Sequence, residues 1–246
     1  MRRAALAIVL LLVAMFAFGP RAHFDPDAVP EPEVPDLDEL DAFVRAREAA
    51  IDDLTPGTAA RIVWAGEDRA RRPWSVVGLH GFSATRQETA PLAARVAEGL
   101  GAHLFEARFT GHGRNGAALA EASAEDWLLD AKTALAIGDR LGERTLVLAS
   151  STGATFAYLA AATGSAPGVA GMAFLSPNFG PANASPQLLL FPWAKAWVPL
   201  VVGEERSWEP TNEAHGRYWT TRYPIEALFP MMASVAAARD ADPDRV

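Results

Sequence analysis

The stretch that most constrains this chain is residues 145–153, which read TLVLASSTG. The aliphatic run predicts a buried parallel strand, because such a run needs apolar cover on both faces. Ala149, Ser151 and Gly153 then form a small-x-Ser-x-small pattern. Small residues at these positions let a strand turn tightly into a helix and hold a serine hydroxyl above the edge of the sheet. The pattern predicts Ser151 as a nucleophile, and the alternative is an ordinary strand end whose serine caps the next helix.

Strands and helices are predicted to alternate on both sides of this turn. The sequence predicts further strands at residues 61–65, 74–79, 103–108 and 169–175, and helices at 36–54, 89–100, 123–141, 152–163 and 223–238. Asp36 is the expected cap of the first helix, and Ser123 with Asp126 forms a capping-box pattern. Such alternation predicts an α/β fold: a mostly parallel sheet with right-handed crossovers and helices on both faces.

Two glycine-containing turns follow the strands before the serine. His80, Gly81 and Phe82 come directly after the predicted strand at residues 74–79. A loop of this kind can supply a backbone N–H to an oxyanion, and Gly81 lets the Phe82 amide point inward. The His80 side chain is interpreted as a hydrogen-bonded loop residue. The second turn, Gly-His-Gly at residues 111–113, follows the next strand and is expected at the same edge of the sheet.

Together, these three junctions resemble those of the α/β-hydrolases, above all the group of monoacylglycerol lipases, lysophospholipases and serine aminopeptidases. The resemblance covers about residues 61–238. It implies a serine hydrolase, of the carboxylesterase or lipase-like kind, with Ser151 as nucleophile and the backbone amides of Phe82 and Thr152 as the oxyanion hole. It also implies an ester substrate, a small molecule or a lipid, whose apolar acyl group lies under a lid at about residues 177–222.

The end of the sequence departs from this family. In α/β-hydrolases the catalytic acid and then the histidine follow two later strands, and no such strands are predicted here. We therefore expect an α/β-hydrolase sheet that lacks the last two strands and a domain, residues 36–246, that is C-terminally incomplete. His215, the only histidine after Ser151, lies in the predicted lid, where a base is poorly positioned. The alternative function is a catalytically inactive, membrane-tethered ligand-binding homologue.

The N-terminal residues 1–22 are predicted to be a signal anchor or signal peptide. Arg2 and Arg3 precede sixteen uncharged, mostly apolar residues, whereas a bilayer span takes about 20. Because no clean cleavage site follows, we expect an uncleaved anchor in the inner membrane with the domain in the periplasm. The alternative is secretion after cleavage. Residues 23–35 are predicted to be a proline-rich acidic linker.

Charge and residue usage exclude several other functions. Residues 25–53 hold eleven acidic and two basic side chains, a net charge of −9, whereas the whole chain carries −8. The remainder is nearly neutral, which argues against a nucleic-acid partner. The chain has no cysteine, and its five histidines show no ligand spacing. We therefore expect no disulfide, no metal and no other cofactor.

Overall fold

The computed structural model describes residues 2–180, 182 and 185–245 of the chain. Its helices are α1 (Arg2–Ala17), α2 (Leu40–Ala49), α3 (Ala90–Leu100), α4 (Gly116–Glu121), α5 (Ala124–Leu141), α6 (Thr152–Ala162), α7 (Ala194–Val202), α8 (Glu213–Tyr218) and α9 (Leu228–Asp240). Its strands are β1 (Arg61–Val63), β2 (Arg72–Leu79), β3 (His103–Glu106), β4 (Gly142–Ser150), β5 (Val169–Leu175), β6 (Glu205–Ser207) and β7 (Arg222–Pro224). Short 3₁₀ helices are η1 (Pro26–Ala28), η2 (Arg86–Glu88), η3 (Ser185–Leu190), η4 (Ile225–Ala227) and η5 (Pro243–Arg245).

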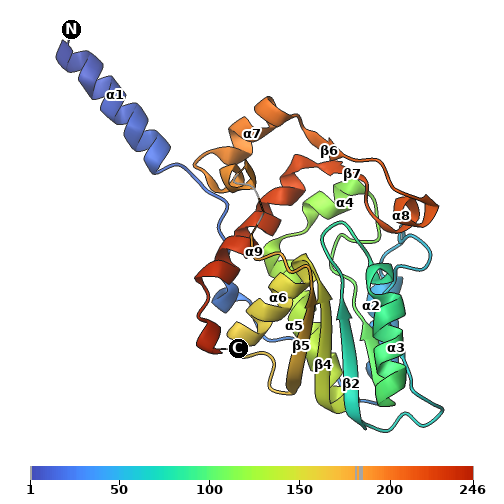
Figure 1. Ribbon diagram of the computed structural model, residues 1–246. Coiled ribbons are helices and arrows are strands. Elements are labelled where there is room, and N and C mark those ends of the chain that lie inside the picture. Colours follow the sequence, from blue (N-terminus) through green and yellow to red (C-terminus); the bar gives the residue numbers. More distant parts are fainter. Residues whose placement is uncertain (1, 181, 183–184, 246) are drawn as a thin grey trace.

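The main sheet has five strands in the order β1-β3-β2-β4-β5 (Figure 1). β3, β2, β4 and β5 run parallel, and β1 pairs with β3 in the antiparallel sense at the edge. β6 and β7 form a separate antiparallel ribbon. The mostly parallel sheet expected from the sequence is thus confirmed.

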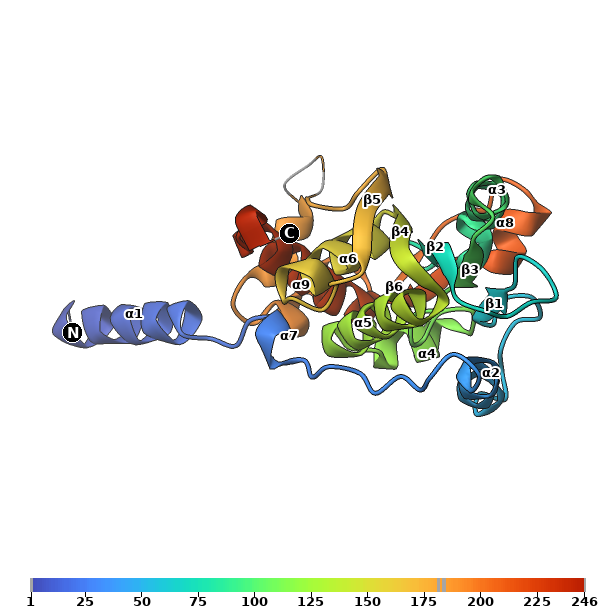
Figure 2. The same cartoon turned by 90° about the horizontal axis from the view of Figure 1, so that it is seen from below.

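Helices cover both faces of this sheet, as the alternating pattern predicts. On one face, Val77 and Val147 pack into the core formed with α5 and α6. On the other face, the neighbouring residues Val76 and Leu148 pack with Ala93 and other α3 residues. Successive strand residues point to opposite faces, so continuous apolar runs produce both layers. Figure 2 shows α3 on the opposite side of the sheet from α5.

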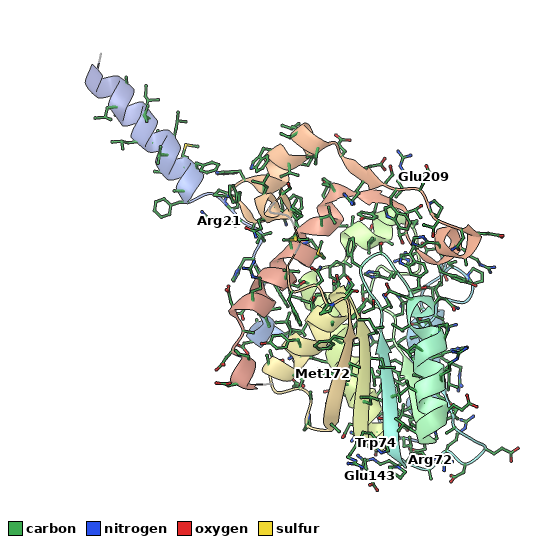
Figure 3. The ribbon with its side chains drawn as sticks, viewed as in Figure 1. Arg21, Arg72, Trp74, Glu143, Met172 and Glu209 are labelled. Carbon is green, nitrogen blue, oxygen red and sulfur yellow. The ribbon has the colours of Figure 1, made fainter. Side chains whose placement is uncertain are left out.

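The strand β5 forms the second edge of the main sheet. Among the described residues it pairs only with β4, and Leu175 at its end is 38% exposed. The last helix, α9, packs against α6 and η3. In Figure 3, Met172 marks β5, while Trp74 and Glu143 lie near the starts of β2 and β4. Glu209, in the segment after β5, lies at the opposite end of the molecule, beyond the carboxyl ends of the strands.

The first predicted helix is wrong in its start and length. Residues 37–39 form a turn, in which the Glu39 N–H bonds to the Asp36 carbonyl at 3.0 Å, and α2 begins only at Leu40. Asp36 therefore does not cap it. The helix ends at Ala49, and beyond it Asp53 pairs with Arg114. Residues 52 and 53 form a turn at positions where the sequence pattern continues the helix.

The start of the last predicted helix is also wrong. Residues 222–224 form β7, and α9 begins at Leu228 after a 3₁₀ turn. Tyr223 precedes Pro224, and the residue before a proline is disfavoured in the helical conformation. Tyr223 is 4% exposed and packs its ring against Phe82, with centroids 5.4 Å apart. Proline and tertiary packing together replace a helical turn by a strand.

The N-terminal helix α1 has 16 residues and projects away from the rest of the molecule (Figure 1). None of the described helices is long and apolar enough to cross a membrane. The inner-membrane anchor and the periplasmic location remain predictions from the sequence. The end of α1 contacts the segment before α7: Trp193 Nε1 donates to the Met15 carbonyl at 3.0 Å.

The proline-rich segment at residues 23–35 lies along α5 (Figure 2). Phe24 and Val29 are buried in the main core. The buried ammonium of Lys132, on α5, donates to the Val29 carbonyl at 2.8 Å and to Glu31 at 2.9 Å. Apolar and charged contacts thus hold this segment against the folded body.

Candidate active site

The predicted turn around Ser151 lies between β4 and α6. β4 ends at Ser150, Ser151 has φ 48° and ψ −115°, and α6 starts at Thr152. A positive φ is strained for a residue with a side chain and is held only by its surroundings. The Ser151 N–H bonds to the Leu175 carbonyl at 2.9 Å, and the Ser151 carbonyl accepts the Asn178 N–H at 3.1 Å. The backbone of this serine is therefore fixed from both sides.

We expect Ser151→Gly to be more stable than Ser151→Ala by about 1 kcal/mol. Glycine adopts this conformation without strain, whereas alanine keeps the strain, which costs about 1–3 kcal/mol per residue. The greater conformational entropy of glycine in the unfolded chain offsets part of this gain. Denaturant unfolding of the two variants measures the difference. Equal stabilities would show that the turn is unstrained.

The loop after β2 lies beside this turn. Leu79 pairs with Ala149, so His80–Gly81 and Ser150–Ser151 leave neighbouring parallel strands at the same level. A Cβ placed on Gly81 would lie 3.1 Å from Ser151 Cβ. A side chain at position 81 would therefore require the Ser151 turn to shift by a few tenths of an ångström, which glycine avoids.

His80 orients the peptide group that follows Gly81. Its Nε2 accepts the Phe109 N–H at 3.1 Å, so its Nδ1 carries the proton and donates to the Gly81 carbonyl at 2.9 Å. The peptide group is planar and trans, so a fixed Gly81 carbonyl also fixes the opposite direction of the Phe82 N–H. Burial lowers the pKa of His80 to about 4, and the ring is neutral at pH 7. The interpretation of His80 as a hydrogen-bonded loop residue is confirmed.

The Gly-His-Gly turn at residues 111–113 packs against the loop after β2. His112 is buried and its Nδ1 donates to the Thr110 carbonyl at 3.1 Å. Its ring lies 5.0 Å from that of His80 and 6.0 Å from that of Phe82, centroid to centroid. Burial lowers the pKa of His112 well below its usual value, so this ring also packs in the neutral form.

Ser151, Phe82 and Thr152 all line one pocket of about 780 Å³. The structure thus brings the three sequence-predicted site residues together at the carboxyl edge of the sheet. The pocket wall is mainly apolar and comes from η3, α7, η4 and α9, through Leu188, Leu189, Trp197, Val198, Val201, Val202, Ile225, Leu228 and Met231. The predicted lid region supplies much of this wall, and the Thr220 N–H ties it to the Ser83 carbonyl at 2.7 Å.

Two polar residues at this site were missed from the sequence. Asn178 lines the pocket, and its Nδ2 lies 3.3 Å from Thr152 Oγ1 and 3.3 Å from Met231 Sδ. The Glu88 carboxylate accepts the Gly81 N–H at 2.6 Å. Neither residue stands in a recognisable motif, and only the folding of the chain brings them to the serine.

His215 lies elsewhere. It is in α8, where its Nδ1 is 3.0 Å from the Thr211 hydroxyl and its ring packs on Trp208 and Trp219. It is not among the described residues that line the serine pocket. Within the described part of the chain, no group of histidine and acidic side chains is arranged to hold a metal ion.

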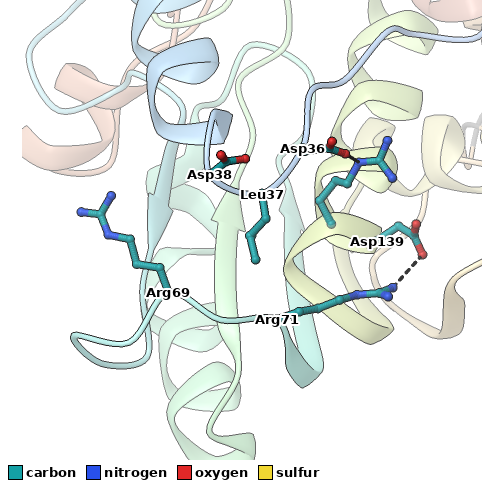
Figure 4. Close-up of a pocket in the computed structure, with 7 residues that line it drawn as sticks. Asp36, Leu37, Asp38, Arg69, Arg71 and Asp139 are labelled. Carbon is teal, nitrogen blue, oxygen red and sulfur yellow. Dashed lines mark ion pairs between the residues drawn. The ribbon is translucent and has the colours of Figure 1, made fainter.

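A second cavity, of about 520 Å³, lies away from Ser151, beside the loop before β2 and the end of α5 (Figure 4). Its charged lining consists of Asp36, Asp38, Asp139, Arg69, Arg71 and Arg140. Arg71 pairs with Asp139 at 3.6 Å, and Arg140 with Asp36 at 3.8 Å. The charges compensate one another across an open groove, which suits surface ion pairs better than a ligand site.

Comparisons with known proteins identify the fold of the chain. No family model and no curated protein matches this sequence. A metagenome-derived lipolytic enzyme, from work on LipS and LipT, superposes with a TM-score of 0.60 at 20% identity, over 75% of this chain and 71% of its own. A monoacylglycerol lipase from Paleococcus ferrophilus superposes with a TM-score of 0.51 at 17% identity, over 74% and 71%. At such identities the likeness shows the fold alone: the chain has the α/β-hydrolase fold expected from its three loop motifs.

Proposed function

We propose that this protein is a serine hydrolase that cleaves an ester through Ser151. The observation that carries the proposal is the strained serine between β4 and α6, which opens onto a pocket. Ser151 Oγ adds to the ester carbonyl carbon, and the amides of Phe82 and Thr152 stabilise the oxyanion that forms. The alcohol leaves as the carbonyl reforms and takes up the proton released from the serine hydroxyl. Water then hydrolyses the acyl-enzyme and restores the serine.

The pocket supports an apolar acyl group as the recognised part of the substrate. Leu189, Val198 and Ile225 are almost fully buried and form a small core with α9. Their neighbours in the pocket wall are also mostly aliphatic. Burial of each acyl CH₂ group contributes about 0.8 kcal/mol to binding. The two solved structures that superpose on this chain, a lipolytic enzyme and a monoacylglycerol lipase, are consistent with this substrate class.

A fluorophosphonate probe tests the proposal, since it reacts with activated serines. We expect covalent labelling of the wild-type chain and complete loss in Ser151→Ala, read by intact-mass spectrometry. Ser207→Ala is the matched control, because Ser207 is an exposed serine at the same pocket, and this variant keeps the label. Labelling that survives Ser151→Ala would overturn the assignment.

The competing proposal is a ligand-binding homologue without catalysis. Two observations favour it: the same apolar pocket, and the position of His215, which packs among tryptophans of the lid region and does not line that pocket. A wild-type chain that binds a fatty acyl ester but neither hydrolyses it nor reacts with the probe would favour this second function.

A further inference from the structure

The Glu88 carboxylate lies between the two loops of the candidate site. Glu88 Oε2 accepts the Gly81 N–H at 2.6 Å. The Ser150 side chain faces the same carboxylate and lowers its pKa as a hydrogen-bond donor. Gly81 precedes Phe82, the proposed oxyanion donor, and Ser150 precedes Ser151, the proposed nucleophile. Glu88 thus interacts with the residue immediately before each reacting group.

The turn that carries Glu88 is itself anchored to the sheet. In η2, the buried guanidinium of Arg86 pairs with Glu106 of β3 at 3.0 Å and donates to the Ala59 carbonyl at 2.8 Å. The Glu106 side chain is fully buried, so this ion pair is costly to disrupt. Glu88 therefore reaches the two loops from a fixed support, two residues along the chain from Arg86.

The packing around the carboxylate is tight. A Cβ placed on Gly81 would lie 3.2 Å from Glu88 Oε2 and 3.1 Å from Ser151 Cβ. Gly81 therefore lies in close contact with both the carboxylate and the nucleophile turn. Burial raises the pKa of the Glu88 carboxyl, and the hydrogen bonds from Gly81 and Ser150 oppose this rise. A partly buried carboxylate is tolerated here because both loops donate to it.

We propose that Glu88 is a positioning residue that clamps the oxyanion loop to the nucleophile turn. The inference rests on the proposed function, because it takes Ser151 as nucleophile and the Phe82 amide as oxyanion donor. Glu88 holds the N–H of Gly81, and His80 holds its carbonyl. With both peptide groups of Gly81 fixed, the Phe82 N–H keeps one direction relative to Ser151. An oxyanion hole depends on this preorganisation of its donors.

The proposed clamp acts through the hydrogen bonds of Glu88 and does not require its negative charge. Variants can therefore distinguish the two roles. A glutamine at position 88 retains an oxygen that accepts the Gly81 N–H. Its amide N–H can donate to the Ser150 hydroxyl, because a hydroxyl both donates and accepts. Alanine removes both contacts. Glu88→Gln and Glu88→Ala therefore test whether the two loops need the hydrogen bonds.

The experiment compares wild type, Glu88→Gln, Glu88→Ala and Gln87→Ala in p-nitrophenyl ester hydrolysis and in the rate of fluorophosphonate labelling. We expect Glu88→Ala to lower kcat by about 10²-fold with KM nearly unchanged, because a misplacement of about 1 Å costs on that order. Glu88→Gln retains most of the rate. Gln87, in the same turn, donates to the Gly57 carbonyl on the other side of the loop, so Gln87→Ala is the matched control and stays active.

Amide hydrogen exchange gives a readout that does not require catalysis. We expect faster exchange at Gly81 and in the loop after it in Glu88→Ala, but not in Glu88→Gln or Gln87→Ala. A Glu88→Gln variant as slow as Glu88→Ala, with normal exchange, would overturn the clamp in favour of a role for the charge. Unchanged exchange and rate in Glu88→Ala would also overturn it. A wild-type chain with no esterase activity would refute the proposed function, and the exchange data would still decide whether the clamp exists.

Discussion

Gly153→Ala is expected to destabilise the protein by about 3 kcal/mol and to abolish labelling of Ser151. A Cβ at this position would lie 2.5 Å from the His80 carbonyl oxygen and 2.7 Å from the Leu79 carbonyl oxygen. Both are backbone atoms at the end of a central strand, so they have little freedom to move. Added atoms in a packed core cost about 1–3 kcal/mol, and rigid backbone neighbours place this site at the upper end. To relieve the contact, α6 must move away from the oxyanion loop.

Denaturant unfolding measures the loss of stability, and Gly99→Ala provides the control. Gly99 lies in α3, and a Cβ there meets nothing within 4 Å. Alanine is favoured over glycine in a helix by about 1 kcal/mol or slightly less, so this variant should be more stable than wild type. A Gly153→Ala variant within about 0.5 kcal/mol of wild type, with labelling intact, would show that the strand and helix can separate without loss of the site.

The parts of the fold that were predicted from the sequence depend on residues close together in the chain. The turn at Ser151 follows from small residues at alternate positions, and the structure shows β4, the strained serine and α6 in that order. The Ser123 and Asp126 side chains form the reciprocal hydrogen bonds of a capping box at the start of α5. In such motifs a few neighbouring side chains determine the backbone, so the sequence pattern is sufficient.

The parts that were missed depend on contacts between distant segments. Beyond the end of α2, Asp53 pairs with Arg114, 61 positions away in the chain. The extended conformation at Tyr223 is completed by its packing against Phe82. Glu88 comes close to Ser150 because β2 and β4 are neighbours in the sheet. Periodicity and local propensity do not contain this information, and no spacing rule marks such a carboxylate in advance.

The last prediction concerns acid stability. We expect His80 to remove about 3 kcal/mol from the free energy of unfolding as the pH falls from about 6.5 to about 4. Burial lowers the pKa of the folded His80 to about 4, whereas an unfolded histidine has a pKa of about 6.5. Between these values the unfolded chain binds a proton that the folded chain does not, so stability falls with pH. This contribution is fully present above pH 6.5 and is lost by pH 4, at about 1.4 kcal/mol per pKa unit.

Other titratable groups near His80 also change the stability of the protein with pH, so the contribution of His80 must be measured separately. His112 packs against its ring and Arg108 lies close enough to disfavour its protonated form. Burial also lowers the pKa of His112, which adds to the loss in acid. Burial instead raises the pKa of Glu88 and Asp130. Protonation of these two carboxyls therefore increases the free energy of unfolding as the pH falls. The net pH dependence of the wild type therefore mixes opposite contributions, and a variant is needed to isolate His80.

His80→Gln is that variant, because a glutamine amide can accept the Phe109 N–H and donate to the Gly81 carbonyl without titrating. Urea unfolding between pH 7.5 and 4 should show a smaller loss of stability in His80→Gln than in wild type, with the difference approaching about 3 kcal/mol. His23→Gln, at an exposed histidine, should retain the wild-type dependence. If His80→Gln and wild type lost stability in parallel, His80 would not be held neutral, and the fixed Gly81 carbonyl that orients the Phe82 amide would need another support.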